Sequence, residues 1–187
     1  GFSFMHYEPL LITYGKKSAS GFTAREALNE WDEETLSNVF FGYGEERYAR
    51  RIAKAVVERR AQQPIETTIE LVEIIRDAVP ALYRRGKLHF ATRTFQALRM
   101  AVNDELGVIE RGFAGAWESL APSGRVAIIT FHSIEDRLVK RMFLEKVKNK
   151  EGTLLYKKPL TPSQSEIQKN PRSRSAKLRV IEKICLS

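Results

Sequence analysis

The sequence predicts an α/β protein in which a mostly helical unit precedes part of an open sheet. Apolar residues recur at helical spacing between Thr23 and Leu120. The run Val126–Phe131 is then apolar without alternation, which is typical of a strand covered by helices on both faces. Two further strand-like segments alternate with helices after it, so the order of elements is that of half of an open α/β sheet.

Residues 1–85 make up the predicted helical unit. Gly1–Ser20, which includes the run Gly15–Ser18, shows no periodicity and is interpreted as a loop. Two capping boxes follow, in which a Thr side chain and a Glu three residues later satisfy backbone amides of the first helical turn. The first predicted helix starts at the box Thr23–Glu26, and the second runs from the cap Asp32 to Phe40. The third covers Glu45–Gln62, and the fourth runs from the box Thr67–Glu70 to Pro80.

Residues 86–187 make up the second predicted unit, after the basic loop Tyr83–Lys87. A long helical pattern starts at Thr92 and is divided in two by Gly107. A strand edge without a neighbour is an aggregation hazard, so we expect further strands from another segment. The later predicted elements are a strand over Val126–Phe131, a helix after it, a strand over Thr153–Lys158, a helix over Ser163–Lys169 and a strand over Ala176–Ile184.

The charge balance favours RNA as a partner. Lys and Arg number 31 against 23 Asp and Glu among 187 residues, a net charge of +8. Such a surplus favours polyanions, because it neutralises phosphates and releases their counterions. No apolar run approaches the roughly 20 residues of a spanning helix, so no membrane partner is expected. Oligomeric state is not readable.

Cysteine use and the N-terminus indicate the setting of the chain. The single cysteine, Cys185, excludes an internal disulfide and suits a reducing, cytoplasmic compartment. No Cys/His cluster has metal-ligand spacing, so no metal site is predicted. No signal peptide is visible. The chain opens on Gly1 instead of methionine, so we expect a processed chain or part of a longer reading frame.

Two features of the helical unit have a functional and a structural interpretation. Gly42-Tyr43-Gly44-Glu45 resembles a dinucleotide fingerprint, but it follows a helix and has Arg47 where the third glycine belongs. A break in the helix is the better account. The other feature is a basic helix face that could follow a phosphate backbone, although a solvated face is the simpler interpretation. It consists of Arg47, Arg50, Arg51 and Lys54.

The turn Phe131-His132-Ser133 is the first candidate site in the second unit. It joins the apolar strand to the next helix, and ligands of open α/β sheets gather at the carboxyl ends of strands. His132 could bind a base or phosphate, shuttle a proton, or serve the structure, and these alternatives stay open. We expect Ser133 to cap the next helix, with Asp136 completing a capping box.

The basic segment Asn170–Lys177 is the second candidate, a loop before the last strand. Loops held on a rigid scaffold commonly bind ligands, so Arg172, Arg174 and Lys177 are predicted to reach RNA phosphates. A flexible connector is the alternative.

Several long blocks, in order, resemble the bacterial small-subunit ribosomal RNA methyltransferase H family, also called MraW. The resemblance runs from Gly1 almost to the C-terminus. It rests on Tyr43–Ala53, Pro64–Thr68, Ala91–Arg99, Val102–Leu106, Phe131–Arg137 and Asn170–Arg179.

The resemblance implies a class I, Rossmann-like methyltransferase domain with a helical domain inserted after its fourth strand. It implies methyl transfer from S-adenosylmethionine to the exocyclic N4 amine of a cytidine in the decoding region of small-subunit (16S) rRNA. Residues 1–85 would be most of the helical insertion, which recognises substrate, and residues 86–187 the C-terminal part of the catalytic domain. Val126–Phe131 would be its fifth strand.

The chain departs from the family pattern in ways that concern the cofactor. The family's glycine-rich loop and its acidic cofactor-binding residues lie upstream of Gly1, so we expect this chain alone not to bind S-adenosylmethionine. The family's Asp-Met-Arg-Met stretch is also absent, and Leu10–Tyr14 stands near its place.

Several residues are candidates for facing the substrate, although the resemblance does not assign them. His132, Arg93 and Gln96 are predicted beside the target, the last two on the polar side of their helix with Asn103. Arg137, Arg172 and Arg174 are predicted to hold phosphates.

Three interpretations remain. The chain is a partial and by itself inactive methyltransferase, one half of a split enzyme whose partner chain supplies the cofactor half, or a non-catalytic RNA-binding protein that keeps the substrate-facing surface.

Overall fold

The computed structural model describes residues 3, 5–15 and 18–184, so Cys185 and parts of the predicted N-terminal loop (residues 1, 2, 4, 16 and 17) lie outside the described residues. The chain divides into two compact units, Gly1–Glu105 and Leu106–Ser187. The boundary between the units thus lies after Glu105, later in the chain than the predicted boundary between residues 85 and 86. The difference arises because helix α6 (Thr92–Val102) packs on helix α2 (Glu33–Gly44) of the first unit.

The first unit is helical, and its helix starts follow the predicted caps. Thr23 and Glu26 form one capping box and Thr67 and Glu70 another, which confirms both predictions. The Asp32 carboxylate accepts from the Thr35 amide at 2.7 Å and caps α2. The other helices of this unit are α1 (Ala24–Glu30), α3 (Ala49–Arg60), α4 (Thr68–Ala78) and α5 (Ala81–Arg84).

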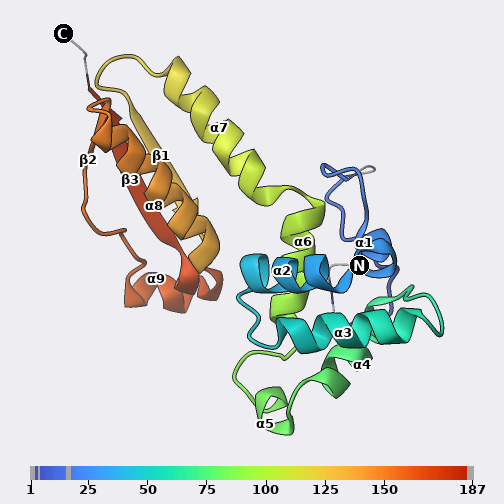
Figure 1. Ribbon diagram of the computed structural model, residues 1–187. Coiled ribbons are helices and arrows are strands. Elements are labelled where there is room, and N and C mark those ends of the chain that lie inside the picture. Colours follow the sequence, from blue (N-terminus) through green and yellow to red (C-terminus); the bar gives the residue numbers. More distant parts are fainter. Residues whose placement is uncertain (1–2, 4, 16–17, 185–187) are drawn as a thin grey trace. The chain divides into compact units, whose positions relative to one another are not determined.

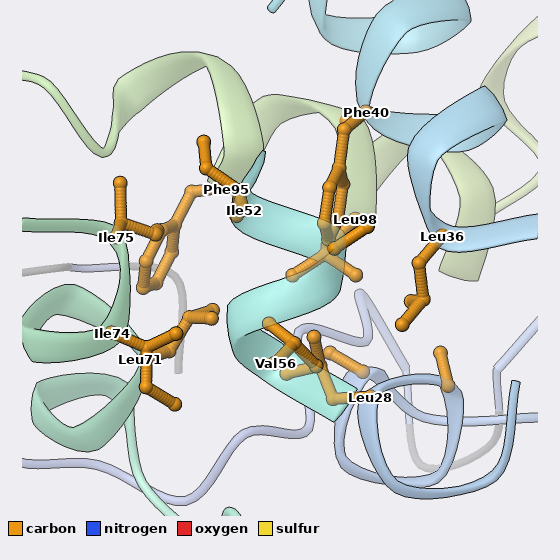
Figure 2. Packing of buried hydrophobic residues seen from close by; sticks show 14 of the residues in the cluster. Leu28, Leu36, Phe40, Ile52, Val56, Leu71, Ile74, Ile75, Phe95 and Leu98 are labelled. Atoms are coloured by element: carbon orange, nitrogen blue, oxygen red, sulfur yellow. The ribbon is translucent and has the colours of Figure 1, made fainter. Parts of the chain in front are cut away.

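A single apolar cluster holds the first unit together, and it draws on every helix from α1 to α4 and on α6. Figure 2 shows side chains of these helices meeting around α3. Phe95 and Leu98 of α6 are buried in this cluster, which is why α6 belongs to the helical unit. The labelled members are Leu28, Leu36, Phe40, Ile52, Val56, Leu71, Ile74, Ile75, Phe95 and Leu98.

Gly44 brings two of these helices into close contact. The predicted helix end at Phe40 is too early, because α2 continues to Gly44, the last residue of the predicted break, and ends where Glu45 adopts a left-handed φ of 50°. A Cβ at Gly44 would lie 2.4 Å from the backbone oxygen of Arg93 in α6. Glycine is therefore needed here for helix packing.

The second unit is built on a three-stranded sheet, and α8 lies across one face of it (Figure 1). Within the described residues the strand order is β1-β3-β2, and both pairings are antiparallel. The predicted strand over Thr153–Lys158 is shorter and begins one residue earlier. The elements of this part are α7 (Glu105–Ser119), β1 (Arg125–Thr130), α8 (Ser133–Lys148), β2 (Gly152–Leu154), α9 (Gln164–Lys169), the 3₁₀ helix η1 (Pro171–Ser175) and β3 (Lys177–Lys183).

The two faces of this sheet differ. Phe113 and Trp117 of α7 and Phe143 of α8 pack with Ile181 of β3 on one face. On the other face Ile129 of β1 is 58% exposed. The prediction that β1 is covered on both faces is therefore wrong for the described residues, because burial along the strand alternates.

No helix in the described ranges is both long enough and apolar enough to cross a membrane.

Candidate functional site

The sheet register brings the two predicted sites of the second unit to the same end of the sheet. Thr130, the last residue of β1, pairs with Lys177, the first residue of β3. The β1–α8 turn, which follows β1, and η1, which precedes β3, therefore lie at the same end of the sheet. We call the exposed arginines here, Arg137, Arg172 and Arg174, the sheet-end cluster.

His132 is the N-cap of α8. Its Nδ1 atom accepts a hydrogen bond from the Glu135 amide at 3.4 Å. The predicted cap at Ser133, with Asp136 three residues on, is wrong by one residue, since a histidine nitrogen replaces the expected hydroxyl. The side chain of His132 is only 18% exposed, so its visible role is structural.

Glu135 completes this cap from the other side. One carboxylate oxygen accepts from the Phe131 amide at 2.9 Å, and the other lies 3.2 Å from His132 Nε2. This second contact is not directed as a hydrogen bond, and Nε2 is buried without a hydrogen-bond partner among the described residues. Burial alone would raise the pKa of Glu135, but the His132 imidazole and the Phe131 amide lower it. The carboxylate thus stays charged at the helix N-terminus, where negative charge is favourable.

Asp136 ties α8 to β3. Its carboxylate accepts from Arg179 Nε at 2.7 Å and from Lys177 Nζ at 3.1 Å. Burial opposes ionisation of Asp136, but the two cations outweigh it and lower its pKa. Lys177, predicted to reach RNA, is therefore engaged inside the unit, and Arg179 is a partner that the sequence interpretation missed. The signal was present, because residues two apart on a strand share a face.

Arg172 and Arg174 are exposed on η1 and form no hydrogen bond or ion pair within the described part of the chain. The predicted loop is thus a 3₁₀ helix. Ser173 between them is buried, and its hydroxyl donates to the Asn170 carbonyl at 2.8 Å. The arginines therefore project from an anchored turn, while Arg137 is exposed on the second turn of α8.

The model of the MraW methylase family matches residues 1–184. The chain belongs to the MraW methylase family. It is 48% identical over 184 residues to a protein of Synechococcus elongatus, 49% identical over 183 residues to one of Nostoc sp., and 46% identical over 199 aligned residues to one of Heliobacterium modesticaldum.

Each of these relatives is named ribosomal RNA small subunit methyltransferase H. The alignments cover 98% of this chain but only 60%, 58% and 63% of the three relatives. The chain thus spans about 60% of the length of the Synechococcus relative.

The residues at the sheet end do not by themselves fit a nucleoside cofactor. Open α/β sheets bind such cofactors at strand-to-helix turns whose helix N-terminus faces the ligand. Among the described residues β1–α8 is a turn of this kind, and two of its amides are already bound, that of Phe131 by the Glu135 carboxylate and that of Glu135 by His132. No reaction step involving a cofactor follows from these residues.

Arg93 and Gln96 lie in the helical unit and contact the end of α2. Arg93 Nη1 donates to the Glu45 carbonyl at 2.6 Å, and Gln96 Nε2 lies 3.4 Å from the Tyr43 carbonyl. Asn103 on the same helix is buried and donates to the Ile12 carbonyl at 2.8 Å. These polar side chains stabilise the packing of the unit, and a substrate contact by Arg93 or Gln96 stays a prediction.

Proposed function

We propose that the intact protein is an S-adenosylmethionine-dependent methyltransferase of small-subunit rRNA, acting on the exocyclic N4 amine of a cytidine in the decoding region. The observation that carries this proposal is the 46–49% identity, over nearly all of this chain, to proteins named ribosomal RNA small subunit methyltransferase H. A ribosomal substrate would place the protein in the cytoplasm. The sheet would belong to a class I methyltransferase domain, and the helical unit would be an insertion in it.

The second part of the proposal is that S-adenosylmethionine is held by the portion of the relatives that this chain does not span. The sheet supports this division. Within the described residues β1 is an edge strand, and its outer face presents exposed Ile129 beside Leu160 and Leu178 around a hollow of about 240 Å³. An apolar sheet face with an unpaired edge is a surface that another segment would cover.

The sheet-end cluster would bind the RNA. Methyl transfer to an amine depends mainly on holding the two reactants in line, so substrate positioning is the main contribution of this chain. Arg172 and Arg174 would hold phosphates beside a cytidine splayed away from its neighbours. His132, as the cap of α8, would act as a positioning residue that fixes the turn beneath them.

A chimera tests the proposed reaction directly. This chain replaces the matching 184 residues of the Synechococcus elongatus relative, and methyl transfer from labelled S-adenosylmethionine to small-subunit rRNA is measured. We expect transfer by the chimera, with the label on cytidine N4 in nucleoside digests. A well-folded chimera that binds S-adenosylmethionine but methylates no rRNA would contradict the proposed reaction.

The chain alone tests the division of labour. Titration with S-adenosylmethionine should give no binding, while small-subunit rRNA should bind with an affinity that falls as salt rises. Saturable cofactor binding by the chain would refute the proposed location of the cofactor site. RNA binding by the chain together with an inactive chimera would instead favour a non-catalytic RNA-binding protein.

Paired charge reversals test the sheet-end cluster. Arg172→Glu with Arg174→Glu should weaken RNA binding and flatten its salt dependence by about one unit per lost phosphate contact. Lys148→Glu with Lys150→Glu, at the far end of α8, is the matched control for net charge. Equal effects of the two pairs would show that overall charge, not this cluster, drives binding.

A further inference from the structure

A groove between α2 and α3 lies outside the sheet-end cluster and combines an exposed aromatic ring with arginines. It encloses about 400 Å³. Its wall from α2 includes Phe41, which is 67% exposed. Its other wall comes from the α2–α3 connection and the first turn of α3, and includes the basic residues Arg47, Arg50 and Arg51.

The arginines at this groove are not neutralised by the protein. No hydrogen bond or ion pair within residues 3, 5–15 and 18–184 uses the guanidinium of Arg47, Arg50 or Arg51. The acidic residue in the lining, Glu46, is fully buried and already engaged, since it accepts from the Tyr83 hydroxyl at 2.7 Å and from the Tyr48 amide at 2.9 Å. The accessible charge of the groove is therefore positive.

Arg47 is also held in place. Its guanidinium carbon lies 4.8 Å from the ring centre of Tyr48 and 4.9 Å from that of Tyr83, and the two rings meet edge to face. Burial and the Glu46 carboxylate both raise the pKa of Tyr83, so its hydroxyl remains a donor to Glu46. A cation fixed between rings loses little freedom when it binds an anion.

We infer that this groove binds an unpaired stretch of RNA, with one base stacked on Phe41 and the flanking phosphates on Arg47, Arg50 and Arg51. Single-stranded nucleic acid is bound by this combination of stacking surface and cationic groove, whereas bases in a duplex cannot reach an aromatic side chain. An acidic peptide would use the arginines but would gain nothing from the flat face of Phe41. The inference rests on the proposed RNA partner and adds a second contact surface in the helical unit.

Phe41→Ala is the decisive variant, measured by fluorescence anisotropy with a short labelled single-stranded RNA. We expect a loss of affinity of roughly 5- to 150-fold, the range for removing one stacked base, with the salt slope unchanged. Phe41→Trp should retain binding, and its fluorescence should be quenched by the RNA. Leu88→Ala, which removes another exposed apolar side chain of the same unit, is the matched control and should have no effect.

Charge variants separate phosphate contacts from stacking. Arg50→Gln should weaken single-stranded RNA binding and make its salt slope shallower by about one unit. Because Phe41 and Arg50 are both exposed, the variants should melt like the wild type, which circular dichroism checks.

Two outcomes would overturn the inference. One is wild-type affinity in Phe41→Ala, which together with displacement of the RNA by poly-glutamate would indicate an acidic protein partner. The other is equal affinity for duplex and single-stranded RNA. If Phe41→Ala binds normally while the Arg172 and Arg174 reversals do not, the groove assignment fails and the proposed function stands. A chain that binds no RNA at all refutes the groove assignment and the sheet-end cluster together, while the chimera still tests the proposed reaction.

Discussion

Replacing Gly44 by alanine should destabilise the helical unit, although alanine is the better helix former. A Cβ rarely lies within 3.0 Å of another heavy atom, yet at Gly44 it would stand 2.4 Å from the Arg93 oxygen and 3.2 Å from Ala97 Cβ. Helix α2 must then move away from α6 by more than half an ångström. Such overpacking costs about 1–3 kcal/mol or more, against which alanine gains about 1 kcal/mol of helix propensity. We expect a net loss of up to about 2 kcal/mol.

Gly42→Ala is the matched control, since a Cβ at Gly42 meets nothing within 4 Å in the same helix. It should stabilise the chain by about 0.5–1 kcal/mol. For a chain of this size each kcal/mol shifts the melting temperature by about 2–4 °C, so the two variants should move the melt in opposite directions. Heat and urea unfolding followed by circular dichroism measure both. If Gly44→Ala melts at or above the temperature of Gly42→Ala, the argument from helix contact is refuted.

Two further predictions concern the sheet unit. Asp136→Asn should cost about 2–4 kcal/mol at pH 7, because it leaves Arg179, only 11% exposed, without its anion. Since the folded pKa of Asp136 is lowered, its contribution is present above the unfolded pKa of about 4 and is lost as pH falls through the folded value. Urea unfolding should therefore show the gap between variant and wild type closing in acid, and a constant gap would contradict the ion pair. His132→Ala should cost about 1 kcal/mol as a lost cap, and His132→Asn should recover most of it in thermal melts. Equal losses in both variants would argue against capping.

The local chemistry of helix starts was readable from the sequence. Thr23 and Thr67 each have a glutamate three residues on, and both boxes form because the motif satisfies its own amides without tertiary help. The start of α8 obeys the same spacing, with His132 in place of a hydroxyl residue and Glu135 as the acid. The sequence predicts Ser133 as the cap because serine is a common N-cap residue and histidine is not.

Other features depend on partners distant in the sequence. Arg93 lies on the polar side of its helix, and periodicity alone cannot show that this side faces the Glu45 carbonyl. Gly44 has the composition of a helix break, but its role is set by the approach of α6, about fifty residues later. The apolar run of β1 predicted two covered faces, whereas the described residues cover one.

Each basic side chain predicted to contact RNA either has an anionic partner within the protein or has none. Those without such a partner are the contacts to test first. Lys177 was predicted for RNA from its place in a basic segment, yet it shares Asp136 with Arg179, so using it for a phosphate would expose a buried carboxylate. Arg172 and Arg174 form no ion pair or hydrogen bond of this kind among the described residues. By the same reasoning, Arg47 and its neighbours form a candidate RNA-binding surface and not merely a solvated face. The acidic residue that lines their groove, Glu46, already accepts a hydrogen bond from Tyr83. Phosphate binding should therefore follow the cations that the fold leaves without an anion, and not the density of basic residues in the sequence.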